Sequence, residues 1–174
     1  MKARRGAWLD ISTVERIRKN HALEHATIHV LSEYESTMRI IGRSDARGFT
    51  LYGYVINGEV VKQASRAALQ RLRSGERHLA LHPNCGTNFV TAGLFASLAA
   101  LVTYAGSEDG WRARLERVPL LVCMITVTLI LAQPIGMVMQ RNVTTKSCLG
   151  ELEIVSVTRR QIGALTLHRV ETRE

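Results

Sequence analysis

Residues 89–106 read FVTAGLFASLAALVTYAG and residues 120–140 read LLVCMITVTLILAQPIGMVMQ, and neither run contains a charged residue. A helix needs about 20 predominantly apolar residues to cross the hydrocarbon core of a bilayer, and both runs approach that length. Two buried helices of a soluble domain could be equally apolar, but each run is long and a polar loop joins them. The sequence therefore predicts transmembrane helices over residues 88–106 and 120–140, with a loop over residues 107–119.

Basic residues near the ends of the two runs indicate how they cross the membrane, because Lys and Arg are enriched in cytoplasmic segments. Five precede the first run and four follow the second: Lys62, Arg66, Arg71, Arg73 and Arg77, then Arg141, Lys146, Arg159 and Arg160. The connecting loop also holds three arginines, although acidic residues accompany them. We therefore expect both chain termini to lie on the cytoplasmic side of a bacterial inner membrane.

The overall composition hides this division of the chain into polar flanks and apolar runs. The 174 residues have a mean hydropathy of +0.01 and a net charge of +8. The positive charge is spread along both flanks without interleaved aromatic residues or a nucleic-acid-binding motif, so it favours anionic lipid headgroups over nucleic acid as the partner. The three cysteines, Cys85, Cys123 and Cys148, indicate no disulfide framework.

The segment before the first run, residues 1–87, predicts helices and strands. Apolar residues recur at helical spacing from Val14 to about Glu35, after the capping-box pattern Ser12-Thr13-Val14-Glu15. Asn57 can cap a second helix that runs to about Ser74. Short runs rich in β-branched and aromatic residues predict strands over 38–41 and 49–55, and a further short strand is expected over 78–82.

The segment after the second run, residues 141–174, predicts a β-hairpin. Apolar and polar residues alternate over 152–158 and again over 165–170. The simplest assembly joins this hairpin to the first strands in one antiparallel sheet, with the two helices packed against it. We therefore predict an α+β membrane protein, with two transmembrane helices and a small cytoplasmic α/β part made from the N-terminal region and the C-terminal hairpin.

Two histidines on the first predicted helix are candidate metal ligands. His21 and His25 are four residues apart, so both imidazoles project from the same side of the helix. They also fall on the apolar line formed by Val14, Ile17 and Ile28, which predicts that they are buried. Burying a polar group costs about 1–3 kcal/mol unless it is hydrogen-bonded or ligated. One metal ion would satisfy both imidazoles, and so would hydrogen bonds to each other and to nearby carbonyls.

Glu24 completes the pattern His-x-x-Glu-His, the inverted order of the zincin motif. In such motifs the two histidines bind zinc and the glutamate acts as the general base of a hydrolase. The pattern spans five residues and arises often by chance, but its place on a buried helix favours a functional role. We therefore consider Glu24 the candidate catalytic residue and Zn²⁺ the expected metal.

A catalytic zinc usually takes three protein ligands, so a third must come from elsewhere in the chain. His82 and Cys85 are the best candidates, because the run His82-Pro83-Asn84-Cys85-Gly86-Thr87-Asn88 gathers polar groups where the soluble part enters the first span. Alternatively, this run only caps the first span and Cys85 packs as a small apolar side chain. Three glutamates could also supply an oxygen ligand: Glu33, Glu35 and Glu76.

Three motifs together resemble a bacterial family of small membrane proteins known only as a domain of unknown function. They are HALEHATI at residues 21–28, GFTLYG at residues 48–53 and HPNCGTN at residues 82–88. The resemblance extends from about Arg18 to Gly136 and implies a soluble part, two spans and a tail, without an established activity. The first motif also resembles that of the inverzincin peptidases, but their downstream glutamate ligand has no evident counterpart here.

Two functions fit these features. The first is a membrane-embedded metal-binding protein that acts as a zinc-dependent hydrolase or peptidase on membrane-proximal substrates at the cytoplasmic face. The second is a non-catalytic accessory or structural subunit of a larger membrane complex, or of a homo-oligomer. Small residues on the first span would suit such close helix packing: Ala92, Gly93, Ala96, Ser97 and Ala100.

Overall fold

A computed structural model describes residues 11–35, 37, 39–53, 57–105, 110–163 and 165–174. The chain forms two compact units. The first, here called the globular unit, combines Met1–His82 with Arg141–Glu174, and the second, here called the helical unit, is Pro83–Gln140. The N-terminal region and the C-terminal tail therefore belong to one folded unit.

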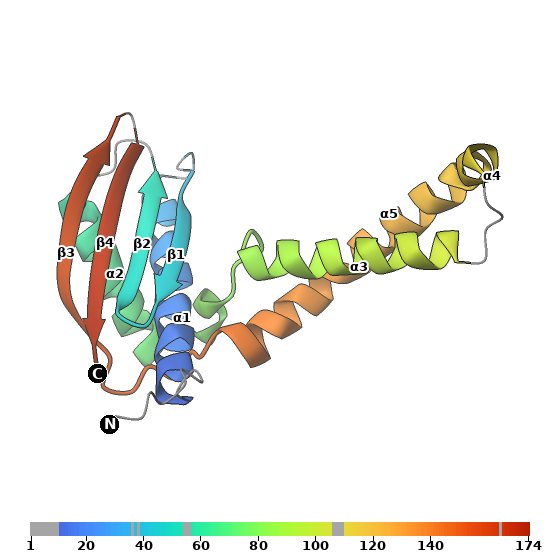
Figure 1. Cartoon of the computed structure of the whole chain (residues 1–174). Coiled ribbons are helices and arrows are strands. Elements are labelled where there is room, and N and C mark those ends of the chain that lie inside the picture. The colour runs from blue at the N-terminus through green and yellow to red at the C-terminus, as the bar shows by residue number, and fades with distance from the viewer. Residues whose placement is uncertain (1–10, 36, 38, 54–56, 106–109, 164) are drawn as a thin grey trace, which may run out of the picture. The chain divides into compact units, whose positions relative to one another are not determined.

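The globular unit contains a four-stranded antiparallel sheet with helices α1 (Ile11–Tyr34) and α2 (Gly58–Arg73) against it (Figure 1). The strands are β1 (Ile41–Asp45), β2 (Gly48–Gly53), β3 (Glu153–Ile162) and β4 (Leu165–Arg173), in the order β1-β2-β4-β3. Strands β2 and β4 join the two hairpins, with Phe49 opposite Val170 and Leu51 opposite His168. The α+β class and the predicted sheet that joins both ends of the chain are confirmed.

Helix α1 packs against several other elements of the globular unit. It contacts α2, strands β1 and β2, and the short segment that follows α2, so it is covered on several sides. Almost every side chain from Lys19 to Leu31 is consequently at least largely buried. The sequence predicted that one apolar line along this helix is buried, but the buried residues lie on more than one side. Val14, the first residue of the predicted line, is exposed. Ser12 lies inside the helix rather than at its N-cap, which corrects the predicted capping box.

Helix α2 has the predicted boundaries. The side chain of Asn57 accepts a hydrogen bond from the backbone N–H of Glu59 at 3.0 Å, which caps the first turn. The last helical residue is Arg73, Ser74 is the C-cap, and Gly75 follows with a φ of 104°. Its buried side packs into the core through small and aliphatic residues: Val61, Ala64, Ser65, Ala68 and Leu72.

The first hairpin differs from its predicted position. Strand β1 begins at Ile41, where the predicted strand over 38–41 ends, and continues through Gly42 to Asp45. A side chain at Gly42 would overlap the carboxyl group of Glu24 on α1, so the strand passes close to the helix only because residue 42 is glycine. Strand β2 begins at Gly48 and matches the prediction to Gly53, while residues 38 and 54–56 lie outside the described residues.

The prediction of a short strand over residues 78–82 is wrong. Residues Arg77–Ala80 instead form a 3₁₀ helix, in which the backbone N–H of Leu81 donates to the carbonyl of His78 at 3.1 Å. The next carbonyls are taken by histidine side chains of α1 rather than by a neighbouring strand. This arrangement satisfies the segment's backbone without adding it to the sheet.

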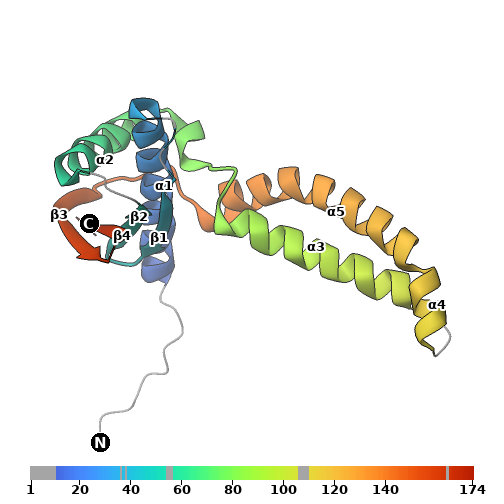
Figure 2. The same ribbon diagram turned by 90° about the horizontal axis from the view of Figure 1, so that it is seen from above.

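The helical unit consists of α3 (Gly86–Tyr104), the short α4 (Trp111–Glu116) and α5 (Val118–Met139). Helices α3 and α5 pack side by side (Figure 2). At one end of the pair, the amide of Gln140 donates to the side-chain oxygen of Asn88 at 2.7 Å. The residues just before α3 and just after α5 are therefore neighbours, so the chain enters and leaves the helical unit at the same end.

Helices α3 and α5 are both long and apolar enough to cross a membrane. They correspond to the predicted runs over 88–106 and 120–140, each beginning two residues earlier than predicted, and α4 occupies part of the predicted loop. Only 17% and 6% of their most apolar windows are buried within the structure. Such exposure is unlike that of core helices in a soluble domain, where apolar side chains are covered.

Candidate metal centre

Four histidines of the globular unit form a continuous row. His21, His25 and His29 lie on successive turns of α1. His82 lies two residues after the 3₁₀ helix that follows α2. The ring centroids of His21 and His25 are 4.3 Å apart, those of His25 and His82 are 5.8 Å apart, and those of His82 and His29 are 5.1 Å apart. The predicted pair on α1 is thus part of a larger imidazole cluster.

Backbone carbonyls orient the two predicted ligands. The Nδ1–H group of His21 donates to the carbonyl of Thr144 at 3.0 Å, and that of His25 donates to the carbonyl of Ala80 at 2.8 Å. In a neutral imidazole with Nδ1 protonated, the lone pair lies on Nε2. Metal-binding histidines commonly use one ring nitrogen as the ligand and donate the other N–H to a carbonyl in this way. Both side chains therefore have the hydrogen bonding of ligands.

Burial favours the neutral form of two members of the cluster, His25 and His82. Burial and the neighbouring His21 lower the pKa of His25 to about 3, although its hydrogen bond to Ala80 opposes this. Burial also lowers the pKa of His82, and His29 adds to the effect. Neutral imidazole is the form that binds metals, so these two side chains are in the ligating form at neutral pH.

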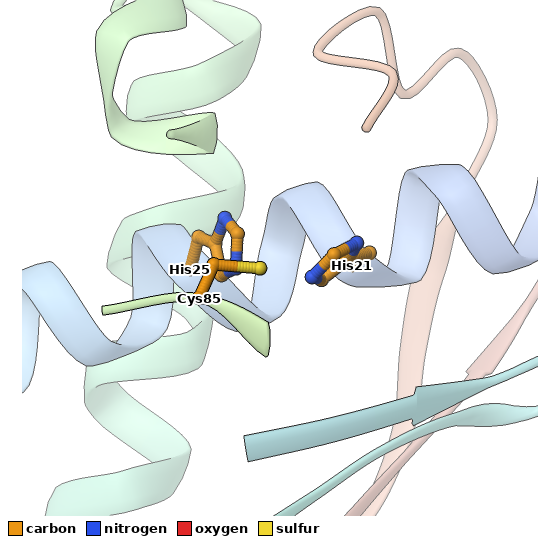
Figure 3. Close-up of side chains that lie close together, drawn as sticks. All are labelled: His21, His25 and Cys85. Carbon is orange, nitrogen blue, oxygen red and sulfur yellow. The ribbon is translucent and has the colours of Figure 1, made fainter. Parts of the chain in front are cut away.

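Cys85 is the third member of the potential ligand group. The side chains of His21, His25 and Cys85 lie close together (Figure 3), and their potential ligand atoms are all within 4.8 Å of one another. Cys85 follows His82 by three residues, so the chain alone keeps the two Cα atoms within about 11 Å. The Cys85 side chain is buried and accepts a hydrogen bond from the backbone N–H of Thr87 at 3.4 Å.

This donor set could hold a metal ion and fits the chemistry of zinc. Zinc binds histidine nitrogen and cysteine sulfur at about 2.0–2.3 Å, so ligands on one tetrahedral ion are separated by about 3.4–3.7 Å. The potential ligand atoms all lie within 4.8 Å of one another, which is comparable with this separation. Two histidines and a cysteine would leave one of four positions open.

Glu24 is directed toward the sheet. Its side chain is buried, and the hydroxyl of Ser44 on β1 donates a hydrogen bond to one carboxyl oxygen. Burial raises the pKa of Glu24, while this hydrogen bond and the nearby His21 oppose the rise. The carboxyl group thus lies beside the histidine row and has a partner of its own on β1.

The remaining sequence candidates have other positions. Glu33 and Glu76 both pair with Arg71 at 2.8 Å, and the Glu35 carboxyl accepts from the Thr37 hydroxyl at 3.0 Å. His29, which the sequence did not single out as a ligand, donates from Nε2 to the carbonyl of Leu81 at 2.8 Å. No short-range signal predicts the orienting carbonyls, because they come from segments 52 to 123 residues away from the histidines.

Comparison with known proteins places the chain in a family. The profile of a family described as a domain of unknown function, DUF6391, matches residues 16–157, and the chain belongs to this family. This confirms the resemblance that the three motifs suggested. The chain is also 42% identical to an uncharacterised protein of Picosynechococcus sp., over 49% of this chain and 48% of that protein. The chain therefore matches about half the length of this relative, and no solved structure matches it.

Proposed function

We propose that this chain is a membrane-anchored metal-binding protein in which His21 and His25 are ligands and Cys85 is the third. His82, whose ring adjoins His25, is the alternative third ligand. Zinc is the expected ion because it accepts mixed histidine and cysteine ligands. The observation that carries the proposal is the orientation of His21 and His25, each of which donates its Nδ1–H to a backbone carbonyl.

The proposed location is the bacterial inner membrane, with both chain termini in the cytoplasm. Helices α3 and α5 expose large apolar side chains along their length, among them Phe89, Val90, Leu101 and Ile130. A bilayer would cover this surface. The basic residues before α3 and after α5 favour the cytoplasmic side for the globular unit.

Metal content tests the proposal directly. The full-length chain is purified in detergent without chelators, and its zinc, iron, copper and manganese are measured by plasma mass spectrometry. We expect about one zinc ion per chain, and its loss in the His21→Ala/His25→Ala variant. His78→Ala is the matched control, because His78 is exposed and should leave the metal content unchanged. Wild-type protein without stoichiometric metal would overturn the proposal.

The third ligand is identified by comparing cysteines. Cys85→Ser should lower the affinity for zinc, whereas Cys148→Ser, at an exposed cysteine, should not. With Co²⁺ in place of zinc, the thiolate-to-cobalt absorption band should disappear only in Cys85→Ser. If the band persists in Cys85→Ser, or is absent from the wild type, His82→Ala becomes the variant that should release the metal.

A hydrolytic role is the finer form of this proposal. Glu24 would serve as the general base, taking a proton from the water that attacks an amide bond of a membrane-proximal peptide. Its place next to His25 in the chain, and close enough to His21 for their charges to interact, supports this role. Its hydrogen bond from Ser44 supports the alternative, in which Glu24 joins α1 to the sheet of a non-catalytic accessory subunit.

Glu24→Gln separates these two roles, because glutamine nearly preserves the shape of the side chain but cannot act as a base. In a hydrolase, cleavage of a quenched-fluorescence peptide library by the zinc-loaded protein should fall at least about 100-fold, with metal content unchanged. In an accessory subunit, the wild type should show no cleavage to lose. Ser44→Ala is the control, since it removes the hydrogen bond to the Glu24 side chain but leaves the carboxyl group that would act as the base.

A further inference from the structure

A second polar site lies on the globular unit, in a pocket of about 420 Å³. One wall is the segment after α2, and the other is the segment that follows α5. The lining residues are Arg77, His78, Ala80, Leu81, Arg141, Asn142, Thr145 and Ser147. The volume is in the range of small-molecule sites, and no acidic residue lines the pocket.

The cationic side chains of the pocket are available to a ligand. Arg77, His78 and Arg141 are exposed, and among the described residues neither arginine forms an ion pair. The acidic residue next to this wall, Glu76, is already paired with Arg71 through two hydrogen-bonding nitrogens. An anion in the pocket would therefore meet two guanidinium groups without displacing an existing partner.

Side chains of α1 hold both walls in place. His25 and His29 donate to the carbonyls of Ala80 and Leu81 in the first wall. Arg18 donates to the carbonyls of Asn142 and Thr145 in the second wall, at 2.8 and 3.2 Å. The pocket is thus organised before any ligand arrives, and Arg18 adds a further positive charge behind it.

Both walls of the pocket are close in sequence to the proposed membrane anchor. The first wall ends at Leu81, five residues before α3 begins, and the second starts at Arg141, two residues after α5 ends. Because the chain enters and leaves the helical unit at the same end, both walls are joined to one end of the proposed membrane anchor. Basic residues close in sequence to a membrane span attract the phosphate groups of anionic lipids.

We propose that this pocket binds the phosphate group of an anionic phospholipid, with Arg77 and Arg141 as its principal contacts. Guanidinium groups bind phosphate oxygens through paired hydrogen bonds, and His78, Asn142 and Ser147 add polar groups at the rim. The proposal concerns a different site from the metal centre. It extends the proposed membrane anchoring by specifying the lipid chemistry that the globular unit recognises.

Binding is tested by native mass spectrometry of the full-length protein in detergent micelles. Phosphatidylglycerol, phosphatidylcholine and inorganic phosphate are titrated separately. We expect specific retention of phosphatidylglycerol, at least about tenfold stronger than that of phosphatidylcholine, which carries the same phosphate but no net charge. Equal retention of the two lipids would overturn the proposal. Binding of inorganic phosphate without a preference for phosphatidylglycerol would show that the pocket takes a free anion and would overturn the lipid assignment.

The residues are tested with two charge-matched variants. Arg77→Ala/Arg141→Ala should weaken phosphatidylglycerol retention at least about tenfold, because it removes both principal contacts. Arg159→Ala/Arg160→Ala removes the same charge from exposed positions of β3 and should change retention less than about twofold. An equal loss in both variants would mean that net charge alone attracts the lipid, which contradicts a built site. Zinc content is measured in both variants as well. If it is unchanged, a loss of lipid retention is independent of the metal centre.

Discussion

At the scale of single residues, the carboxyl group of Glu24 occupies the space that a side chain at Gly42 of β1 would fill. The Ser44 hydroxyl donates to one of its oxygens, and Gly42 leaves room for the other. A buried carboxyl is stabilised when its oxygens are hydrogen-bonded, and a glycine opposite it allows the strand to come close enough. The close packing of α1 on β1 therefore depends on a helix residue and a strand residue that are 18 positions apart.

We expect Gly42→Ala to destabilise the protein by about 1–3 kcal/mol, because the added methyl group would overlap the Glu24 carboxyl. The measurement is urea unfolding of the full-length chain in detergent, followed by circular dichroism. The double variant Gly42→Ala/Glu24→Ala provides the control. It should be less destabilised than the sum of the two single variants, and strict additivity would contradict the contact.

Asp45 and Arg169 form a second residue-scale contact, across strand β2. Both guanidinium NH groups of Arg169 donate to the Asp45 carboxylate, at 2.7 and 2.9 Å. The hydrogen bonds from Arg169 lower the pKa of Asp45 below its ordinary value of 3.8. The ion pair thus stabilises the fold above that ordinary value, and its contribution disappears as the pH falls through the lower folded-state pKa.

Arg169→Gln should therefore weaken the dependence of stability on acid pH. The Asp45 side chain is more than half exposed, so the expected change is at most about 1 kcal/mol. It is measured as the difference in unfolding free energy between about pH 6 and about pH 3. Arg43→Gln, which removes an equal charge from an exposed position of β1, should keep the wild-type difference. Identical profiles for Arg169→Gln and the wild type would refute the coupling.

At the scale of elements, helices α3 and α5 come close where the chain enters and leaves the helical unit. Gly136 on α5 faces Asn88, and a side chain at Gly136 would overlap the Asn88 amide. Asn88 also accepts from the buried Gln140 and donates to the carbonyl of Pro83 at 2.6 Å. Small residues and interhelical hydrogen bonds are the usual means by which membrane helices associate.

We expect Gly136→Ala to loosen this end of the helix pair, because Asn88 would have to move and lose its hydrogen bond from Gln140. The midpoint of thermal aggregation in detergent should fall by several degrees, consistent with a loss of about 1–2 kcal/mol. Gly93→Ala on α3 is the matched control, since an added methyl group there meets nothing within 4 Å. A fall of the same size in Gly93→Ala would show that the effect is not specific to the contact.

The elements also show how much the sequence alone could predict. The two apolar runs, the polar cap at Asn57 and the alternation in the tail depend on neighbours in the chain, and each yields an element close to its predicted position. The conformation of segment 78–82 and the position of the strand through Gly42 could not be predicted from the local sequence. Both depend on contacts with side chains of α1, which are distant in the chain. The spacing of His21 and His25 predicts that they lie on one side of the helix. Their ring orientation depends on the carbonyls of Thr144 and Ala80, which are close only in the folded protein.

At the scale of the whole molecule, the helical unit interrupts the globular unit between residues 82 and 141. The contact between Asn88 and Gln140 keeps the two connections together, so both parts of the globular unit are joined to the same end of the helix pair. If α3 and α5 span a membrane, the loop containing α4 must reach the opposite side. The distribution of basic residues predicts that the globular unit lies on the cytoplasmic side.

Cysteine labelling tests this arrangement in intact bacterial cells with a membrane-impermeant maleimide. In a chain whose other cysteines are serine, Cys148 after α5 should react only once the inner membrane is permeabilised. A chain without native cysteines that carries Arg112→Cys on the exposed α4 should react in intact cells, because α4 lies in the loop between the spans. Both positions are exposed in the structure, so a difference in labelling reports the side of the membrane rather than burial. Labelling of Cys148 in intact cells would invert the proposed topology, and labelling of both positions would mean that the helix pair does not span the membrane.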